Sequence, residues 1–201
     1  MNTAKPSLRT ADLALAGFFT ALLAVCSWIS IPAAVPFTLQ TFGVFLTLEL
    51  LGGRRGLLAI LAWLLLGAAG LPVFAGFRGG VSSLLGTTGG YLIGFVFTGL
   101  IYMLAERLTG AQSGADPRGR VRMSLPVRIA VLVLGLAVCY AFGTLWFILV
   151  YTRTKGAVGW GTALGWCVIP FVIPDLLKLA LAEIVAGRLK KRGCRIKRWP
   201  L

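Results

Sequence analysis

The 201-residue chain has no histidine and only six acidic residues. Histidine is the commonest general base and the commonest metal ligand in proteins, so its absence argues against much enzyme and metal chemistry. No Gly-x-x-x-x-Gly-Lys-Ser/Thr loop is present to hold the phosphates of ATP. No Gly-x-Ser-x-Gly elbow occurs either, and no histidine can activate a serine or cysteine. The sequence therefore disfavours an enzyme.

Cysteines are few, and their spacing is not that of a disulfide framework or a metal site. Three lie within apolar segments and one lies in a basic tail: Cys26, Cys139, Cys167 and Cys194. We therefore expect neither disulfides nor a bound metal. No internal repeat is visible, which disfavours a duplicated transporter fold.

Charge is also scarce. Charged residues make up 13% of the chain, against about 25% in soluble domains, and the mean hydropathy is +0.88. A membrane-spanning helix needs roughly 20 apolar residues. Six apolar segments approach this length, the second and third only marginally, at 13–31, 37–51, 56–71, 84–105, 129–151 and a sixth that ends near 186. We predict an all-α integral membrane protein with six transmembrane helices.

Basic residues dominate the remaining charge, with a net value of +14. With a cytoplasmic N-terminus, six spans leave only Arg78, Arg153 and Lys155 in outer loops. Most other basic residues then lie in cytoplasmic segments: Lys5, Arg9, Arg54, Arg55, Arg107, Arg118, Arg120, Arg122, Arg128 and the tail from Arg188 to Arg198. The positive-inside rule favours this orientation, with both termini cytoplasmic. We interpret the tail as a topology determinant near anionic lipid, not as a nucleic-acid-binding segment.

These patterns predict one membrane domain over residues 1–201. It comprises a cytoplasmic N-terminus (1–12), a six-helix membrane region (13–187) and a basic cytoplasmic tail (188–201). A cytoplasmic loop at about 106–128 separates the fourth and fifth helices.

Most of the acids have an ordinary expected position. Asp12, Glu106 and Asp116 lie at or near cytoplasmic ends of the predicted helices. Glu49 precedes Arg54 and Arg55, and Glu183 precedes the basic tail, so we expect both side chains to snorkel toward those cations.

Asp175 and Lys178 lie within the sixth apolar segment. A charged side chain deep in a helical span costs about 2.5–3.5 kcal/mol on insertion scales, so such residues face a cavity or a partner. Their i, i+3 spacing places them on one helix face. They form either a self-neutralising packing pair or a functional site, and intramembrane ionisable residues favour the second interpretation.

The position of this pair favours a site near the outer face. Asp175 precedes the cytoplasmic end of its helix by about 13 residues, or roughly 20 Å. Pro174 suits the first turn of a helix, so the sixth helix is expected to start near Pro170 to Pro174. Residues 164–169 would then form re-entrant structure at the outer side.

Glycine-rich segments are predicted to lie at the same side. Glycine permits close approach of the backbone and exposes N–H groups. Dense helix packing explains Gly94 and Gly99 equally well, but it does not explain Arg78-Gly79-Gly80 in an outer loop. Arg78 alone is also compatible with a lipid headgroup anchor.

Four motifs together resemble the BioY family of biotin-specific substrate-binding (S) components of energy-coupling-factor (ECF) transporters. The resemblance covers roughly residues 13–186. The motifs are Val35-Pro-Phe-Thr-Leu-Gln-Thr41, Gly70-Leu-Pro-Val-Phe-Ala-Gly76, Thr88-Gly-Gly-Tyr91 with Gly94, and Pro170-Phe171 followed by Asp175-x-x-Lys178. Pro174 departs from the glycine expected before the aspartate.

The resemblance implies six helices around a pocket that opens toward the outer face of the bacterial cytoplasmic membrane. It implies biotin as ligand, no cofactor, and as partners a transmembrane coupling subunit and two ABC-type ATPases. ATP would then be bound only by partner subunits, in agreement with the missing phosphate loop.

The resemblance also suggests roles at the pocket. Asp175 would accept from the urea N–H groups of biotin, and Lys178 would donate to the urea carbonyl. Arg78, with the backbone N–H groups of Gly79 and Gly80, would bind the ligand carboxylate. The remaining candidates are aromatic walls and an amide contact: Phe37, Tyr91, Trp166 and Gln40.

In such families, small residues on the first helix dock on the coupling subunit. Here the small residues form two adjoining stripes, Ala16-x-x-x-Thr20-x-x-x-Ala24 and Gly17-x-x-x-Ala21. Either stripe equally well permits packing within the chain.

Three other functions remain open at this point. An S component for a different vitamin would share the scaffold. A membrane enzyme acting on a lipid or isoprenoid would need clustered acids or an activated nucleophile at the cytoplasmic face, and Asp116 alone supplies neither. A structural assembly protein would use Asp175 and Lys178 only as an ion pair.

Overall fold

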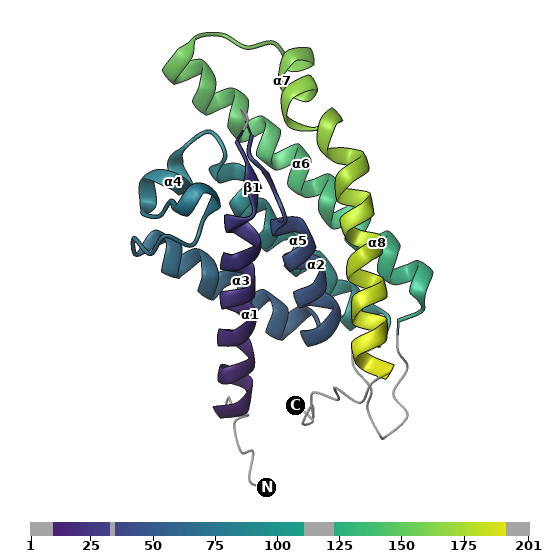
Figure 1. Cartoon of the computed structure of the whole chain (residues 1–201). Coiled ribbons are helices and arrows are strands. Elements are labelled where there is room, and N and C mark those ends of the chain that lie inside the picture. The colour runs from purple at the N-terminus through teal and green to yellow at the C-terminus, as the bar shows by residue number, and fades with distance from the viewer. Residues whose placement is uncertain (1–9, 33–34, 111–122, 192–201) are drawn as a thin grey trace, which may run out of the picture.

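The computed structural model describes residues 10–32, 35–110 and 123–191, with side chains from residue 13 onward. These segments form a helical bundle (Figure 1). The elements in order are α1 (Thr10–Trp28), β1 (Ser30–Ile31), β2 (Phe37–Thr38), α2 (Gln40–Leu51), α3 (Gly53–Ala68), the 3₁₀ turn η1 (Ala75–Phe77), α4 (Val81–Leu85), α5 (Gly89–Leu108), α6 (Leu125–Lys155), α7 (Trp160–Cys167) and α8 (Ile169–Lys191).

Each of the six predicted apolar segments supplies one of the six longer helices, α1, α2, α3, α5, α6 and α8. The prediction of a chain built from apolar helices is therefore confirmed. Within the described residues, α5 and α6 are long and apolar enough to cross a membrane by length and composition, and α1 and α2 contain shorter apolar helices.

Two parts of the predicted helices are instead extended. Ser30 pairs with Thr38 and Ile31 with Phe37 in a short antiparallel ladder, so the prediction of helix at these residues was wrong. Pro32 and Pro36 lie between the two strands and lack the N–H that a continuing helix needs. The ladder brings β2 and the start of α2 close to the end of α1.

Glycines divide the predicted fourth segment. The short α4 ends at Leu85, Gly86 is extended, and α5 begins at Gly89. A Cβ atom on Gly89 would lie only 1.7 Å from the carbonyl oxygen of Leu84. This sharp change of direction therefore requires glycine, and it starts α5 beside the loop that carries Arg78.

The last part of the chain has more helix than expected. Residues 160–167 form α7, so the predicted re-entrant structure over 164–169 is mainly a short helix. α8 begins at Ile169, in agreement with a start near Pro170. Pro174 lies inside α8, and its expected place in the first turn was wrong. Asp175 is consequently well within the helix.

Helix packing in the bundle depends on close approach at small residues. α5 and α6 pack along much of their length, α8 packs mainly against α2, and α1 packs against α3. A Cβ on Gly94 would lie 2.6 Å from Cys139 Sγ, and one on Gly99 would lie 3.0 Å from Leu57. The packing interpretation of these two glycines is thus confirmed.

Figure 1 shows the start of α1 and the end of α8 at one end of the bundle, with the β1–β2 ladder and α7 toward the other. Cys26, Cys139 and Cys167 are free thiols. Within the described residues no group of acids and cysteines has the arrangement of a metal site. Cys194, Asp116, the side chain of Asp12 and most of the predicted 106–128 loop and tail lie outside the described part.

Glu49 does not reach the surface as predicted, and it shares with Glu183 a network of charged residues that includes Lys190 of the predicted basic tail. Glu49 is fully buried, and its carboxylate lies 3.6 Å from Arg128 Nε and 3.2 Å from Lys190 Nζ. Tyr102 donates its hydroxyl to Glu49 at 3.2 Å, and Arg128 donates to Glu183 at 2.8 Å. These five side chains, from α2, α5, α6 and α8, form what we call the inner ionic cluster.

Glu106 also differs from the expected solvated position. It is half-buried and accepts a hydrogen bond of 2.7 Å from the backbone N–H of Gly53. Gly53 starts α3, where the first N–H groups have no partner within the helix. Glu106 therefore caps α3 from the end of α5.

Candidate functional site

The polar centre of the bundle is the ion pair of Asp175 and Lys178 on α8. Lys178 Nζ lies 2.7 Å from Asp175 Oδ1, and the residues are 2% and 7% exposed. Both charges are thus removed from solvent and from the lipid-facing side of the helix. Burial of this kind is tolerated when the two charges are paired and their other hydrogen-bonding positions are used.

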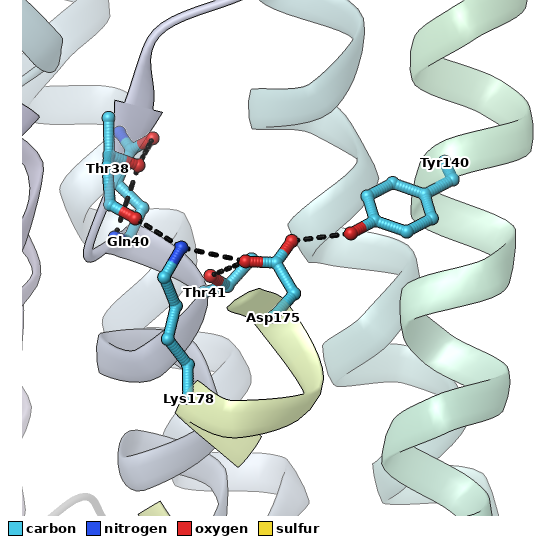
Figure 2. Close-up of polar contacts among 6 residues, drawn as sticks. All are labelled: Thr38, Gln40, Thr41, Tyr140, Asp175 and Lys178. Carbon is cyan, nitrogen blue, oxygen red and sulfur yellow. Dashed lines mark hydrogen bonds and ion pairs between the residues drawn. The ribbon is translucent and has the colours of Figure 1, made fainter. Parts of the chain in front are cut away.

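Three further groups complete the surroundings of the pair (Figure 2). Thr41 on α2 donates to Asp175 Oδ1 at 2.8 Å, and Tyr140 on α6 donates to Asp175 Oδ2 at 2.6 Å. Lys178 also donates to the backbone carbonyl of Thr38 at 2.6 Å. The pair therefore joins α2, α6, α8 and the β2 strand at one point.

An aromatic ring covers the ammonium group. Lys178 Nζ lies 4.3 Å from the centre of the Phe37 ring, a distance suited to a cation–π interaction. Phe37 in turn stacks on Phe171, with ring centres 5.6 Å apart. Phe37 thus covers the charged pair but lines neither cavity, and its role as a wall for the ligand ring stays a prediction.

Asp175 and Lys178 line a small cavity of about 50 Å³. This ion-pair cavity adjoins a larger cavity of about 280 Å³. Val35, Pro36, Gln40 and Tyr91 line both. The two cavities therefore share a wall, and we refer to them together as the recess, with a charged end and a wider end.

Gln40 and Tyr91 are held in place at the junction of the two cavities. The Gln40 side chain accepts from Thr38 and donates to Ser27, both at 3.0 Å. Tyr91 and Thr144 share a hydrogen bond of 2.9 Å between their hydroxyl oxygens. Both predicted residues thus lie on the shared wall.

Arg78 lies at the wider end of the recess. Its exposed side chain lines the larger cavity together with hydroxyl-bearing residues. These residues are Ser82, Ser83, Thr87 and Thr88. The wider end therefore combines one cation with several neutral hydrogen-bonding groups, which suits an anionic group that enters from solvent.

The two glycines after Arg78 serve the backbone of the loop. Gly80 has a φ of +85°, and its N–H donates to the Gly67 carbonyl at 2.7 Å. A Cβ on Gly79 would lie 2.3 Å from the carbonyl oxygen of Leu71. The Gly80 N–H is already used within the chain, so it is not available for the expected nest, while the role of the Gly79 N–H stays a prediction. Both glycines instead permit the tight turn that presents Arg78.

Trp166 is not brought to the recess. Its ring is exposed on α7 and packs edge-on against Tyr151 with ring centres 6.1 Å apart. Neither cavity has Trp166 in its lining. The proposed ring-wall role of Trp166 has no support in this arrangement.

Several site residues were not identified from the sequence. Thr41 and Thr38 belong to the quoted 35–41 motif, but nothing in the motif indicates that they contact Asp175 and Lys178 of α8. Tyr140 lies in a long apolar segment without a charged neighbour. The one available signal was its phenolic hydroxyl in a predicted span, since a buried tyrosine usually finds a hydrogen-bond partner.

Of the two small-residue stripes on α1, one packs mainly against the rest of the chain and the other is exposed. Thr20 and Ala24 are buried, and the Thr20 hydroxyl donates to the carbonyls of Ala16 and of Ala59 on α3. The first stripe thus packs within the chain, which corrects its expected availability to a partner. Gly17 and Ala21 are exposed.

The recess provides a carboxylate acceptor, an ammonium donor, aromatic side chains and, at its wider end, a guanidinium. These groups suit the binding of a small polar molecule. The fold and the site together define a class: a helical membrane protein with a ligand recess toward one end of its bundle.

Comparison with known proteins gives the family. The family model described as BioY matches residues 1–195, and the chain belongs to the BioY family. It is 42% identical over 182 residues to the biotin transporter BioY of Thermotoga maritima, covering 90% of this chain and 96% of that protein. It is 37% identical over 184 residues to a probable biotin transporter BioY of Pyrococcus horikoshii, covering 91% and 98%.

A solved structure has the same fold. The crystal structure of the S-component for biotin from an ECF-type ABC transporter matches with a TM-score of 0.75 and 26% identity. The match covers 93% of this chain and 96% of that chain. The chain thus has the S-component fold nearly from end to end.

Proposed function

We propose that this protein captures biotin and serves in its uptake as the substrate-specific S component of an ECF-type transporter. One observation carries the proposal: in a chain of the BioY family, Asp175 and Lys178 form a buried pair at the narrow end of a ligand recess. This pair offers one strong acceptor and one strong donor, side by side.

The chemistry of biotin suits this end of the recess. Its cyclic urea carries two N–H donors and one carbonyl acceptor. Asp175 accepts from a urea N–H, and Lys178 donates to the urea carbonyl, so both charges gain a hydrogen bond. The ion-pair cavity takes the polar edge of the urea, while Tyr91 at the junction contacts the ring system.

The aliphatic tail and its carboxylate extend toward the wider end. Arg78 lines the larger cavity and is the cation for the carboxylate, since guanidinium and carboxylate form strong charge-assisted hydrogen bonds. The hydroxyl groups nearby provide additional donors. The different chemistry of the two ends, an acceptor–donor pair at one and a cation at the other, therefore fixes the direction in which the ligand lies.

For the membrane arrangement we propose six spans, formed by α1, α2, α3, α5, α6 and α8, in the bacterial cytoplasmic membrane. The start of α1 and the end of α8 lie at the same end of the bundle (Figure 1), as an even number of spans requires. With the basic segments cytoplasmic, the recess lies toward the outer face.

The partners follow from the S-component role. The chain has no phosphate-binding loop of the GxxxxGK[S/T] type, so the energy for uptake comes from two ATPase subunits through a transmembrane coupling subunit. Gly17 and Ala21 are exposed on α1, and a Cβ on Gly17 would meet nothing within 4 Å. They mark the α1 face that we assign to the coupling subunit.

Asp175→Asn tests the proposal. The variant keeps the size of the side chain but removes the negative charge that accepts the urea N–H. We expect biotin uptake by cells to fall by at least about 100-fold, because a charged hydrogen bond in a desolvated site is lost. Membrane insertion, followed on an immunoblot of the membrane fraction, should be unchanged. Wild-type uptake in this variant would refute the assignment.

A further inference from the structure

The two oxygens of the Asp175 carboxylate are bound from opposite sides. We propose that Tyr140 is a positioning residue for substrate recognition, whose hydroxyl holds the Asp175 carboxylate in the orientation that accepts the urea N–H. This inference rests on the proposed function. It adds a third helix, α6, to the recognition of the ligand by α2 and α8.

The geometry separates Tyr140 from the other donors. Thr41 and Lys178 both approach Oδ1, at 2.8 and 2.7 Å. Tyr140 alone among the described residues is seen to donate to Oδ2, at 2.6 Å. In Figure 2 its ring extends from α6 and reaches Asp175 from the side opposite to Lys178.

This arrangement fixes the plane of the carboxylate. Rotation of the carboxylate about the Cβ–Cγ bond moves both oxygens, so donors on both oxygens resist it more strongly than donors on Oδ1 alone. The Tyr140 hydroxyl supplies the donor on Oδ2. Tyr140 also lines the ion-pair cavity beside Asp175, so the carboxylate it fixes is one that faces ligand space.

The number of donors leaves capacity for a ligand. An ionised carboxylate has about four lone-pair positions. Among the described residues, Thr41, Lys178 and Tyr140 use three of them. A urea N–H can therefore bind Oδ2 without displacing Tyr140, and it meets an oxygen that is already oriented.

A second consequence concerns selectivity. Because three donors orient the Asp175 acceptor, the site favours a ligand that presents an N–H at this position. It disfavours one that presents an oxygen or a methylated nitrogen, since the acceptor would lose its partner. Removal of the Tyr140 hydroxyl should weaken this discrimination together with the affinity.

Tyr140→Phe is the test, because it removes only the hydroxyl oxygen. Binding is measured on purified protein in detergent with biotin and with two analogues, each methylated on one urea nitrogen. We expect the Kd for biotin to rise roughly 10- to 100-fold, the effect of one hydrogen bond to a charged group. For the analogue that blocks the N–H facing Asp175, the affinity penalty seen in wild-type protein should shrink in the variant.

Tyr151→Phe is the matched control. Tyr151 lies on the same helix, roughly 16 Å from Tyr140 at 1.5 Å per residue, and its ring stacks on Phe147. This variant should keep wild-type affinity and wild-type discrimination between the ligands. An equal loss in both variants would show a general effect on α6 and overturn the inference.

The outcomes separate this inference from the proposed function. If wild-type protein fails to bind biotin, the proposed function fails. If wild-type protein binds biotin and Tyr140→Phe binds it equally well, the proposed function stands and the positioning role is refuted. An equal loss for biotin and both analogues, with a lowered melting temperature, would indicate a structural role only and would also refute it.

Discussion

In the proposed function, pairing and ligand recognition at Asp175 and Lys178 depend on the same charges. Each side chain is nearly fully buried, so neither charge is tolerable without the other. The carbonyl of Thr38 and the ring of Phe37 further fix the ammonium group. The protein therefore holds a donor and an acceptor in fixed positions at a buried site, at a cost in stability if either is lost.

Removal of one charge of the Asp175–Lys178 pair should destabilise the protein. Lys178→Met leaves the Asp175 carboxylate buried without its counter-charge, and we expect a loss of roughly 3–5 kcal/mol in stability. Combining it with Asp175→Asn should restore much of the melting temperature, but not biotin binding. Thermal unfolding in detergent, with and without biotin, measures both effects.

Lys155→Met is the control for this pair of variants, because Lys155 is exposed near the end of α6. Its melting temperature should stay close to that of wild-type protein. A double variant that recovers biotin binding would contradict the recognition role of the pair.

Individual residues were predictable from the sequence to an uneven degree. The pair itself was evident, because charged residues inside an apolar membrane segment are rare and usually functional. Thr41 and Tyr140 were not, since their partner lies on another helix and no local pattern records tertiary proximity. Trp166 was selected for its aromatic type, but it lies on α7 against Tyr151 and away from the recess.

At the scale of the helices, α8 is tied to α2 at two levels. Lys178 donates to the carbonyl of Thr38 in β2, the strand just before α2. Lys190 contacts Glu49 near the end of α2. Arg128 adds a link from α6 to α8 through Glu183. The inner ionic cluster thus fixes the far end of the helix whose other end carries the binding pair.

Arg128→Met should therefore destabilise the bundle without altering the recess. Loss of the guanidinium leaves Glu183 and Glu49 without a cation that both contact, and breaking such a buried network costs about 3–5 kcal/mol. We expect a lower melting temperature and little change in the Kd for biotin. Differential scanning fluorimetry and equilibrium binding on the same sample measure the two quantities.

The matched control is Arg153→Met, on the same helix but exposed, which should leave the melting temperature nearly unchanged. A large loss of biotin affinity in folded Arg128→Met protein would show that the two ends of α8 are not independent, contrary to this account.

The sequence located the helices better than it located their ends and partners. Apolar length and interrupting glycines or prolines indicated all six long helices. The β1–β2 ladder was missed because two residues per strand carry no period. Glu49 and Glu183 were assigned to the nearest cations along the chain, whereas Arg128, distant from both in sequence, contacts both, and Lys190 also contacts Glu49.

For the whole molecule, function is divided between the two ends of the bundle. The ligand recess lies near the starts of α2 and α8, and the inner ionic cluster lies near their ends. The exposed Gly17 and Ala21 on α1 are outside both regions. In the proposed function, one small chain thus combines a capture site, an ionic cluster at the opposite end and an exposed helix face that we assign to the coupling subunit.

The central claim is that the recess binds biotin itself and not another vitamin. Equilibrium dialysis of the purified protein with radiolabelled biotin, in competition with unlabelled thiamine and riboflavin, tests it most directly. The account predicts saturable binding of one biotin per chain, displaced by unlabelled biotin but not by the other two vitamins. Absence of biotin binding, or equal displacement by thiamine or riboflavin, would contradict it.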